Sequence, residues 1–225
     1  FVLMISSILC AQLASGCALV SRGETLHVRY FTLETPQPVG HTLAAAAPGL
    51  ELRLGRVDAS GGLGEQLAVR TGQNELTYRE DQRWTERPAQ FVRRGLERAL
   101  FEERGLTRAY SGVAPTLDVE LVELETDQGA SPTARVRLAA RLHDGRRGLC
   151  NDTFAASEPV AVSSSGTEDA PRVEASVASL SKALQRSLDQ LATRVVQCLA
   201  TREQAANTQP PVTSDHHTGG LQGSA

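Results

Sequence analysis

The strongest hydrophobic pattern in the chain lies toward its C-terminal end. Apolar residues recur there every three or four positions, which places them on one face of a helix. These residues are Val173, Val177, Leu180, Leu184, Leu188, Leu191, Val195 and Leu199. The pattern predicts a long helix over residues 171–199 whose apolar stripe packs on the protein's own sheet. The alternative is that the far end of this helix contacts a partner subunit.

A second, shorter helix is predicted directly after Trp84. Thr85 can cap it, Pro88 suits its first turn, and Gly105 can end it. Between these points apolar residues recur at helical spacing, namely Phe91, Val92, Leu96, Ala99 and Leu100. We expect Trp84 itself to fill the core at the corner between a strand and this helix.

The rest of the domain alternates apolar and polar residues, which is typical of strands. The clearest pair is a hairpin over residues 117–125 and 135–143, with acidic outer residues on one arm and basic ones on the other. Opposite charges on neighbouring strands would pair across the sheet. Shorter strands are expected at residues 27–33, 50–57, 66–71, 75–80 and 149–156. The predicted fold class is α/β (α+β): a single domain with a mixed, mostly antiparallel sheet packed against two amphipathic helices.

Composition narrows the classes of function. The chain has 225 residues, 26 acidic and 23 basic side chains, and a formal net charge of -3. A nucleic-acid-binding protein would usually carry a basic excess, so we predict no nucleic-acid partner. An aromatic content of 4% argues against a large aromatic-lined ligand pocket.

The N-terminal segment resembles a targeting signal. Residues 1–16 carry no charge and end in small residues before Cys17. They are too few to span a bilayer, which takes roughly 20 residues, but they resemble the apolar core of a secretory signal. The run Leu13-Ala14-Ser15-Gly16-Cys17 resembles a bacterial lipobox, although Ala14 stands where that pattern usually has leucine. We expect 1–16 to be an N-terminally incomplete lipoprotein signal peptide, Cys17 to be lipidated, and 17–26 to be anchor and tether. The alternative is an ordinary buried first helix.

The residue after Cys17 and the remaining cysteines indicate the compartment. Ala18, rather than aspartate, follows Cys17, which in Gram-negative bacteria favours the outer membrane, facing the periplasm. Within the mature domain only Cys150 and Cys198 remain, and an oxidising periplasm would allow them to form a disulfide. Two buried free thiols are the alternative. The chain has no CxxC pair, so neither a redox motif nor a zinc knuckle is supported.

The sequence contains no local signature of a catalytic site, which would need a nucleophile, a base and an orienting group. His27, His41 and His143 do not have the spacing of metal ligands. Asp215-His216-His217 lies in the polar segment 201–225, which we expect to be a disordered tail. We therefore predict no enzyme activity, no cofactor and no metal. A periplasmic hydrolase with a site assembled from distant residues is the enzymatic alternative.

Several motifs follow the lipobox in a fixed order. Tyr30-Phe31-Thr32-Leu33 precedes a run of prolines, LRLGRV follows, and VRTGQNELTYREDQRWTERP leads into the shorter helix. This order, from about Cys17 to Ala200, resembles the ABC-type transport auxiliary lipoproteins, the PqiC-like family. The most specific part is 70–88. Its most distinctive residues, which we expect to be mostly structural, are Asn74, Tyr78, Trp84 and Pro88.

The resemblance implies a non-enzymatic lipoprotein domain over residues 27–200 on the periplasmic face of the outer membrane. Members of that family partner with MCE-type lipid-binding proteins and membrane transport components that move lipids between the two membranes. The resemblance thus implies that this chain docks such a complex to the outer membrane as a homo-oligomer. The alternative is an envelope lipoprotein that binds and activates or assembles another envelope protein.

Overall fold

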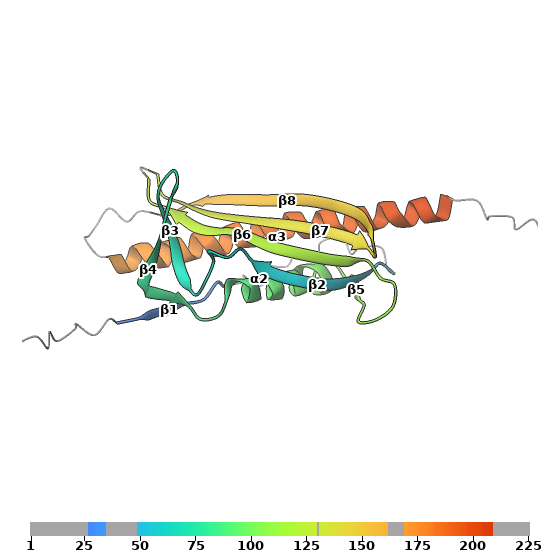
Figure 1. The fold of residues 1–225 in the computed structure, drawn as a ribbon, viewed down its shortest axis with the longest axis horizontal. Coiled ribbons are helices and arrows are strands. Elements are labelled where there is room, and N and C mark those ends of the chain that lie inside the picture. The colour runs from blue at the N-terminus through green and yellow to red at the C-terminus, as the bar shows by residue number, and fades with distance from the viewer. Residues whose placement is uncertain (1–26, 35–48, 130, 162–168, 209–225) are drawn as a thin grey trace, which may run out of the picture.

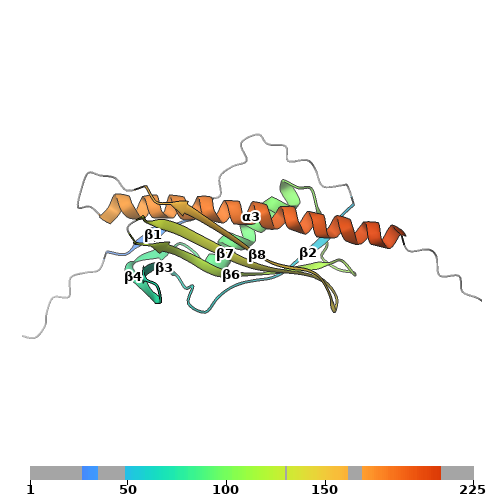
Figure 2. The same ribbon diagram turned by 90° about the horizontal axis from the view of Figure 1, so that it is seen from above.

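The computed structural model describes residues 27–34, 49–129, 131–161 and 169–208 (Figure 1). Within these residues, eight strands form one open sheet, and two α-helices lie on the same side of it (Figure 2). The strands are β1 (Arg29–Phe31), β2 (Glu51–Ala59), β3 (Gln66–Gly72), β4 (Glu75–Trp84), β5 (Thr107–Arg108), β6 (Thr116–Asp127), β7 (Thr133–Asp144) and β8 (Arg147–Pro159). The helices are α2 (Pro88–Glu97), which continues into the π-helical turn η2 (Arg98–Glu102), and α3 (Asp169–Thr208).

The sheet branches at β6, which pairs with three strands. Along one edge β6 pairs with β7 in an antiparallel ladder, and β7 pairs in the same way with β8. The other edge of β6 is divided between β2, which pairs in parallel near its start, and β3, which pairs in parallel near its end. The two longest ladders are antiparallel, so the expectation of a mixed, mostly antiparallel sheet is confirmed.

The apolar stripe of α3 packs on the protein itself. All eight residues of the stripe are buried, and Leu188 is only 1% exposed. Leu188 lies where α2 crosses α3, and a Cβ on Gly95 of α2 would lie 2.4 Å from its Cδ1 atom. Glycine therefore lets the two helices approach closely, and the predicted packing of the stripe against the core is confirmed.

The start of α2 differs from the prediction in one respect. The helix begins at Pro88 after Arg87, which makes no capping hydrogen bond through its side chain, so the prediction that Thr85 caps the helix is wrong. The Thr85 N–H instead donates to the Phe31 carbonyl at 2.8 Å, which ties this corner to β1. Trp84 is 3% exposed and meets Phe91 edge to face at 5.9 Å, as expected for a core residue at the corner.

Helix α3 is longer than predicted. It reaches Thr208, and most side chains after Ala200 are exposed. Residues 201–208 thus belong to the helix rather than to the predicted tail. Polar residues can extend an existing helix, because each added residue forms a backbone hydrogen bond and its side chain can stay in solvent. Residues 209–225 lie outside the described residues.

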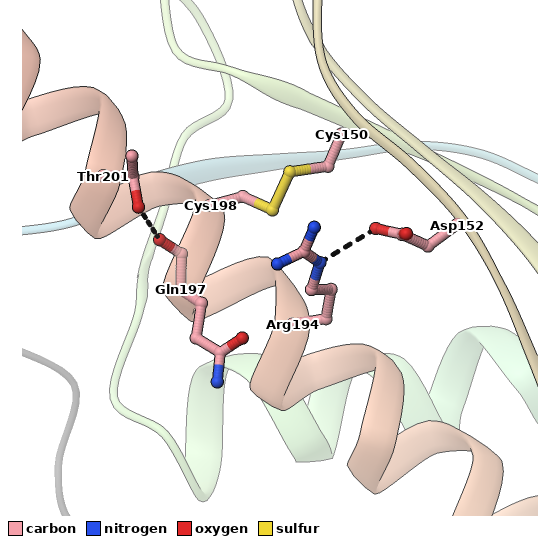
Figure 3. Close-up of a disulfide and its surroundings, with 6 residues drawn as sticks. All are labelled: Cys150, Asp152, Arg194, Gln197, Cys198 and Thr201. Carbon is pink, nitrogen blue, oxygen red and sulfur yellow. Dashed lines mark hydrogen bonds and ion pairs between the residues drawn. A yellow bond between two sulfur atoms is a disulfide. The ribbon is translucent and has the colours of Figure 1, made fainter.

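Helix α3 is joined to β8 at several points, and Figure 3 shows the disulfide and the ion pair between Asp152 and Arg194 at one end. The Ser179 hydroxyl donates to the Pro159 carbonyl at 2.9 Å, and at the other end Cys198 and Cys150 are joined by a disulfide. The helical segment 179–198 spans about 28 Å at 1.5 Å per residue, and the strand segment 150–159 spans about 30 Å at 3.3 Å per residue. Helix and strand therefore have matching lengths between these two contacts.

Candidate docking surface

Loop 109–115 connects β5 to β6 at one end of the long axis of the molecule (Figure 1). Both ends of the loop are held by β2: the Ala109 N–H donates to the Leu52 carbonyl at 3.0 Å, and the Arg53 N–H donates to the Pro115 carbonyl at 2.8 Å. The Arg53 guanidinium also donates to the Gly112 carbonyl at 2.7 Å. Gly112 has φ +86°, which favours glycine at this turn. The backbone of the loop is thus fixed by hydrogen bonds.

The same loop exposes two apolar side chains. Tyr110 is 84% exposed and Val113 is 86% exposed, against 65% for Tyr30 and 40% for Tyr78. The Arg108 guanidinium carbon lies 4.4 Å from the Phe101 ring centre and 6.0 Å from that of Tyr110. Tyrosine is among the residue types enriched at interface hot spots, and a loop that is already fixed has little ordering entropy to lose on binding.

The loop lies at the opposite end of the molecule from β1. Arg29 of β1 pairs with Glu174 near the start of α3 at 3.0 Å. Near the end of α3, Arg202 pairs with Asp144, which ends β7, at 2.5 Å. The helix between these two ion pairs is about 42 Å long at 1.5 Å per residue. The chain therefore enters the domain at one end and presents Tyr110 at the other.

The face of the sheet away from the helices carries ion pairs between β6 and β7. Arg137 pairs with Glu123 at 2.9 Å, and Arg135 pairs with Asp127 at 3.0 Å. The prediction that acidic and basic outer rows pair across this hairpin is thereby confirmed. Beside them, Glu125 of β6 accepts from Arg70 of β3 at 2.5 Å, and this hydrogen bond raises the pKa of Arg70 above its ordinary value.

A hollow of about 1210 Å³ opens between the start of α2 and strands β2, β6 and β7. Two of its acidic groups have protein partners: Asp118 Oδ1 accepts from the Arg56 N–H at 2.8 Å, and Glu120 accepts from the Ser60 hydroxyl at 2.8 Å. The described residues that line it include no histidine or cysteine, and Ser60 is their only serine. The described lining therefore offers the Ser60 hydroxyl without an imidazole base.

The residues singled out from the sequence do not meet in one place. Trp84 and Pro88 are buried at the corner before α2, whereas Asn74 is exposed in the turn between β3 and β4. Tyr78 lies on the outer side of β4, where its hydroxyl would be 2.9 Å from a Cβ on Gly62. Cys17 lies outside the described residues. The four motif residues thus occupy a corner and a hairpin rather than a common site.

Cys150, Asp152 and Cys198 place their potential metal-ligating atoms within 4.8 Å of one another (Figure 3). Zinc is bound by thiolates, whereas these two sulfur atoms are joined to each other. Asp152 is also paired, with Arg194 of α3 at 3.0 Å. The cluster therefore serves the contact between β8 and α3.

Tyr110 and Val113 carried no signal in the sequence. Their segment has neither helical nor strand periodicity, and the serine and glycine beside Tyr110 indicate only a loop. Only the positions of Arg53 and Leu52, far away in the chain, show that the loop is held in place.

Comparison with known proteins places the chain in a family. The family model described as ABC-type transport auxiliary lipoprotein component matches residues 31–196. The chain belongs to this family. The matched segment begins in β1 and ends within α3, so it includes loop 109–115, all of α2 and α3 as far as residue 196. A search of curated proteins found no match.

Solved structures share the fold of this auxiliary lipoprotein. The protein XCC0632 from Xanthomonas campestris is similar with a TM-score of 0.60 and 19% identity, covering 78% of this chain and 99% of its own. A second crystal structure, of an uncharacterized protein, has a TM-score of 0.56 and 13% identity, covering 74% of this chain and 97% of its own. Within the described part of this lipoprotein, no helix combines the length and hydropathy needed to cross a membrane.

Proposed function

We propose that this auxiliary lipoprotein performs no reaction and docks an ABC/MCE-type intermembrane lipid transport complex to the outer membrane from its periplasmic face. The observation that carries the proposal is the fixed loop 109–115, which exposes Tyr110 and Val113 at the end of the domain opposite β1. In a family of transport auxiliary components, such a loop is suited to contact the membrane transport components.

The proposed lipid anchor lies before β1, at the end of the domain opposite loop 109–115. In this proposal Cys17 carries acyl chains, and two or three chains on one residue give stable membrane attachment. From Cys17 to Arg29 the chain can span at most roughly 40 Å, so in this proposal β1 is the end of the domain nearer the membrane. Tyr110 is then free to face a periplasmic partner, because about 42 Å of helix separates the two ends of the domain.

The side chains that line the hollow support a role without catalysis. In this hollow Asp118 and Glu120 accept hydrogen bonds from the Arg56 N–H and the Ser60 hydroxyl, and the described lining offers Ser60 without an imidazole base. We further propose that the lipoprotein acts as a homo-oligomer, which would place several docking loops around one transport complex.

The test is a crosslinking isolation of the full chain from its native envelope, with mass spectrometry of captured proteins and lipids. Recovery of an MCE-type protein with phospholipid, lost in Tyr110→Ser/Val113→Ser, is the expected result. Tyr30→Ser is the matched control, because Tyr30 is an exposed tyrosine at the opposite end. Capture of only peptidoglycan enzymes or glycan would contradict the proposal and favour an activator or assembly factor. Hydrolysis of an envelope substrate that is lost in folded Ser60→Ala would refute the non-enzymatic role.

A further inference from the structure

A small cavity, here called the β4 slot, opens between the start of α3 and strands β3, β4 and β6. These elements come together at the end of the domain where β1 lies (Figure 1). The volume of the slot is about 30 Å³, which admits a water-sized group but not a whole ligand. Its lining includes Arg79, Gln82, Thr126, Arg172 and Ser176, all of which can donate hydrogen bonds.

The ladder between β3 and β4 is interrupted at the slot. Between two paired positions, β3 has Leu67 alone, whereas β4 has the run from Arg79 to Gln82. A bulge bends its strand and turns side chains in new directions, and bulges are over-represented next to active sites. Arg79 and Gln82 both line the slot, although residues three positions apart lie on opposite faces of a regular strand. The bulge therefore brings a charged and an amide side chain to one cavity.

Two buried polar side chains of the slot have no hydrogen-bond partner among the described residues. Gln82 is only 5% exposed and Thr126 only 8% exposed. Buried polar side chains are nearly always hydrogen-bonded to protein, water or ligand. The Gln82 amide can donate two hydrogen bonds and the Thr126 hydroxyl one. The slot thus offers buried donors that the described part of the protein leaves unused.

Two arginines add positive charge to these donors. Within the described segments, neither Arg79 nor Arg172 has an ion-pair partner. Asp127, the acidic residue of the lining, is already engaged, since its two carboxylate oxygens accept from the Gly129 N–H at 2.9 Å and from Arg135 at 3.0 Å. Guanidinium groups match the geometry of phosphate oxygens and bind them through charge-assisted hydrogen bonds. The slot therefore favours an anion with several oxygens over a cation.

We propose that the β4 slot binds a phosphate group. One phosphate oxygen, which is water-sized, enters the slot and accepts hydrogen bonds from Gln82 and Thr126. The oxygens that stay outside pair with Arg79 and Arg172. Inorganic phosphate and a phospholipid headgroup both carry this group. The lipid source rests on the proposed anchor at Cys17, which places this end nearer the membrane, whereas the phosphate chemistry does not rest on the proposed function.

The test is calorimetric titration of the full chain in a mild non-ionic detergent, with inorganic phosphate as the first probe. Arg79→Gln/Arg172→Gln should weaken binding by at least about tenfold, since a hydrogen bond to a charged group contributes about 1.5–3 kcal/mol. Arg146→Gln/Arg147→Gln is the matched control, because it removes the same charge from two exposed arginines between β7 and β8, outside the slot. Circular dichroism confirms that each variant is folded.

A second variant separates the slot from general attraction between an anion and a positive surface. Thr126→Val removes one hydroxyl and no charge, and it should weaken phosphate binding by about tenfold. Thr116→Val, at the other end of β6 and outside the slot, is its control and should bind as the wild-type chain does.

The outcomes decide whether the slot is a phosphate site. Saturable binding that both slot variants weaken and both control variants keep supports the proposal. No saturable binding of phosphate or phospholipid by the wild-type chain would overturn it and leave water as the occupant. Equal losses in the slot and control variants, or full binding by folded Thr126→Val, would also overturn it, because general charge attraction would then explain the binding.

Short-chain phosphatidylglycerol and the diacylglycerol with the same chains identify the source of the phosphate. Tighter binding of the phosphatidylglycerol than of inorganic phosphate, with no binding of the diacylglycerol, assigns the slot to a lipid headgroup. Inorganic phosphate that binds at least as tightly assigns it to free phosphate. Equally tight binding of the diacylglycerol would overturn the proposal, since that lipid has no phosphate. All titrations use the purified chain, so their failure would leave the capture of transport components untouched.

Discussion

The disulfide between β8 and α3 provides the prediction whose size follows most directly from the structure. Cys150 and Cys198 are 48 residues apart in the chain, and the crosslink closes a loop of that length in the unfolded state. Loop-closure entropy for such a loop corresponds to about 4 kcal/mol at 25 °C, and measured losses for native disulfides are typically 2–5 kcal/mol. We expect reduction to lower the free energy of unfolding by about 3–4 kcal/mol, a large share of the roughly 5–15 kcal/mol typical of a domain.

The assay is guanidinium unfolding of the full chain, followed by circular dichroism with and without reductant. The matched control is Cys150→Ala/Cys198→Ala, which should start less stable and should not respond to reductant. Cys10 and Cys17 are present in both proteins, so the difference isolates the pair. Equal stability of the wild-type protein in both conditions would refute the reasoning. So would ready alkylation of Cys150 in the untreated folded protein.

Three further predictions concern the core and the anchor. Leu188→Asp should unfold the domain, because it places a carboxylate in the buried crossing of α2 and α3. A variant that circular dichroism shows to be folded and native mass spectrometry shows to be monomeric would contradict this packing. Arg104 is buried, which lowers its pKa, and it donates hydrogen bonds to the Ala99 and Asp189 carbonyls at 2.9 and 3.0 Å. Arg104→Met should therefore lower the free energy of unfolding, measured in urea, by about 2–4 kcal/mol. No measurable loss would show that these hydrogen bonds are dispensable. Cys17→Ser should leave the outer-membrane fraction on envelope fractionation, and its retention there would disprove the anchor.

The local spacing of apolar residues predicted most of the helices and strands. The spacing of Leu188 and its neighbours on α3 predicted a buried stripe, and the alternation along β6 and β7 predicted both the hairpin and its ion pairs. These predictions succeed because burial on one face imposes a repeat on the sequence itself. The ends of the helices were less accurate, since α3 continues through polar residues that the apolar repeat does not mark.

Features that depend on distant residues were not predictable. The irregularity in β2 near Gly55 requires glycine, because a Cβ there would lie 2.3 Å from Asp118 Oδ1, and Asp118 also accepts from the Arg56 N–H. Loop 109–115 is a similar case, since Arg53 holds Gly112 from 59 residues away. Nothing near Gly55 or Gly112 in the sequence identifies these partners.

Site-specific photocrosslinking tests the docking proposal most directly. A photoreactive amino acid replaces Tyr110 in one protein and Tyr30 in another, and both are irradiated in intact native envelopes. The account predicts that the Tyr110 position crosslinks to an MCE-type or other membrane transport component and that the Tyr30 position does not. Crosslinks to such a component from the Tyr30 position alone, or none from the Tyr110 position to any transport protein, would contradict it.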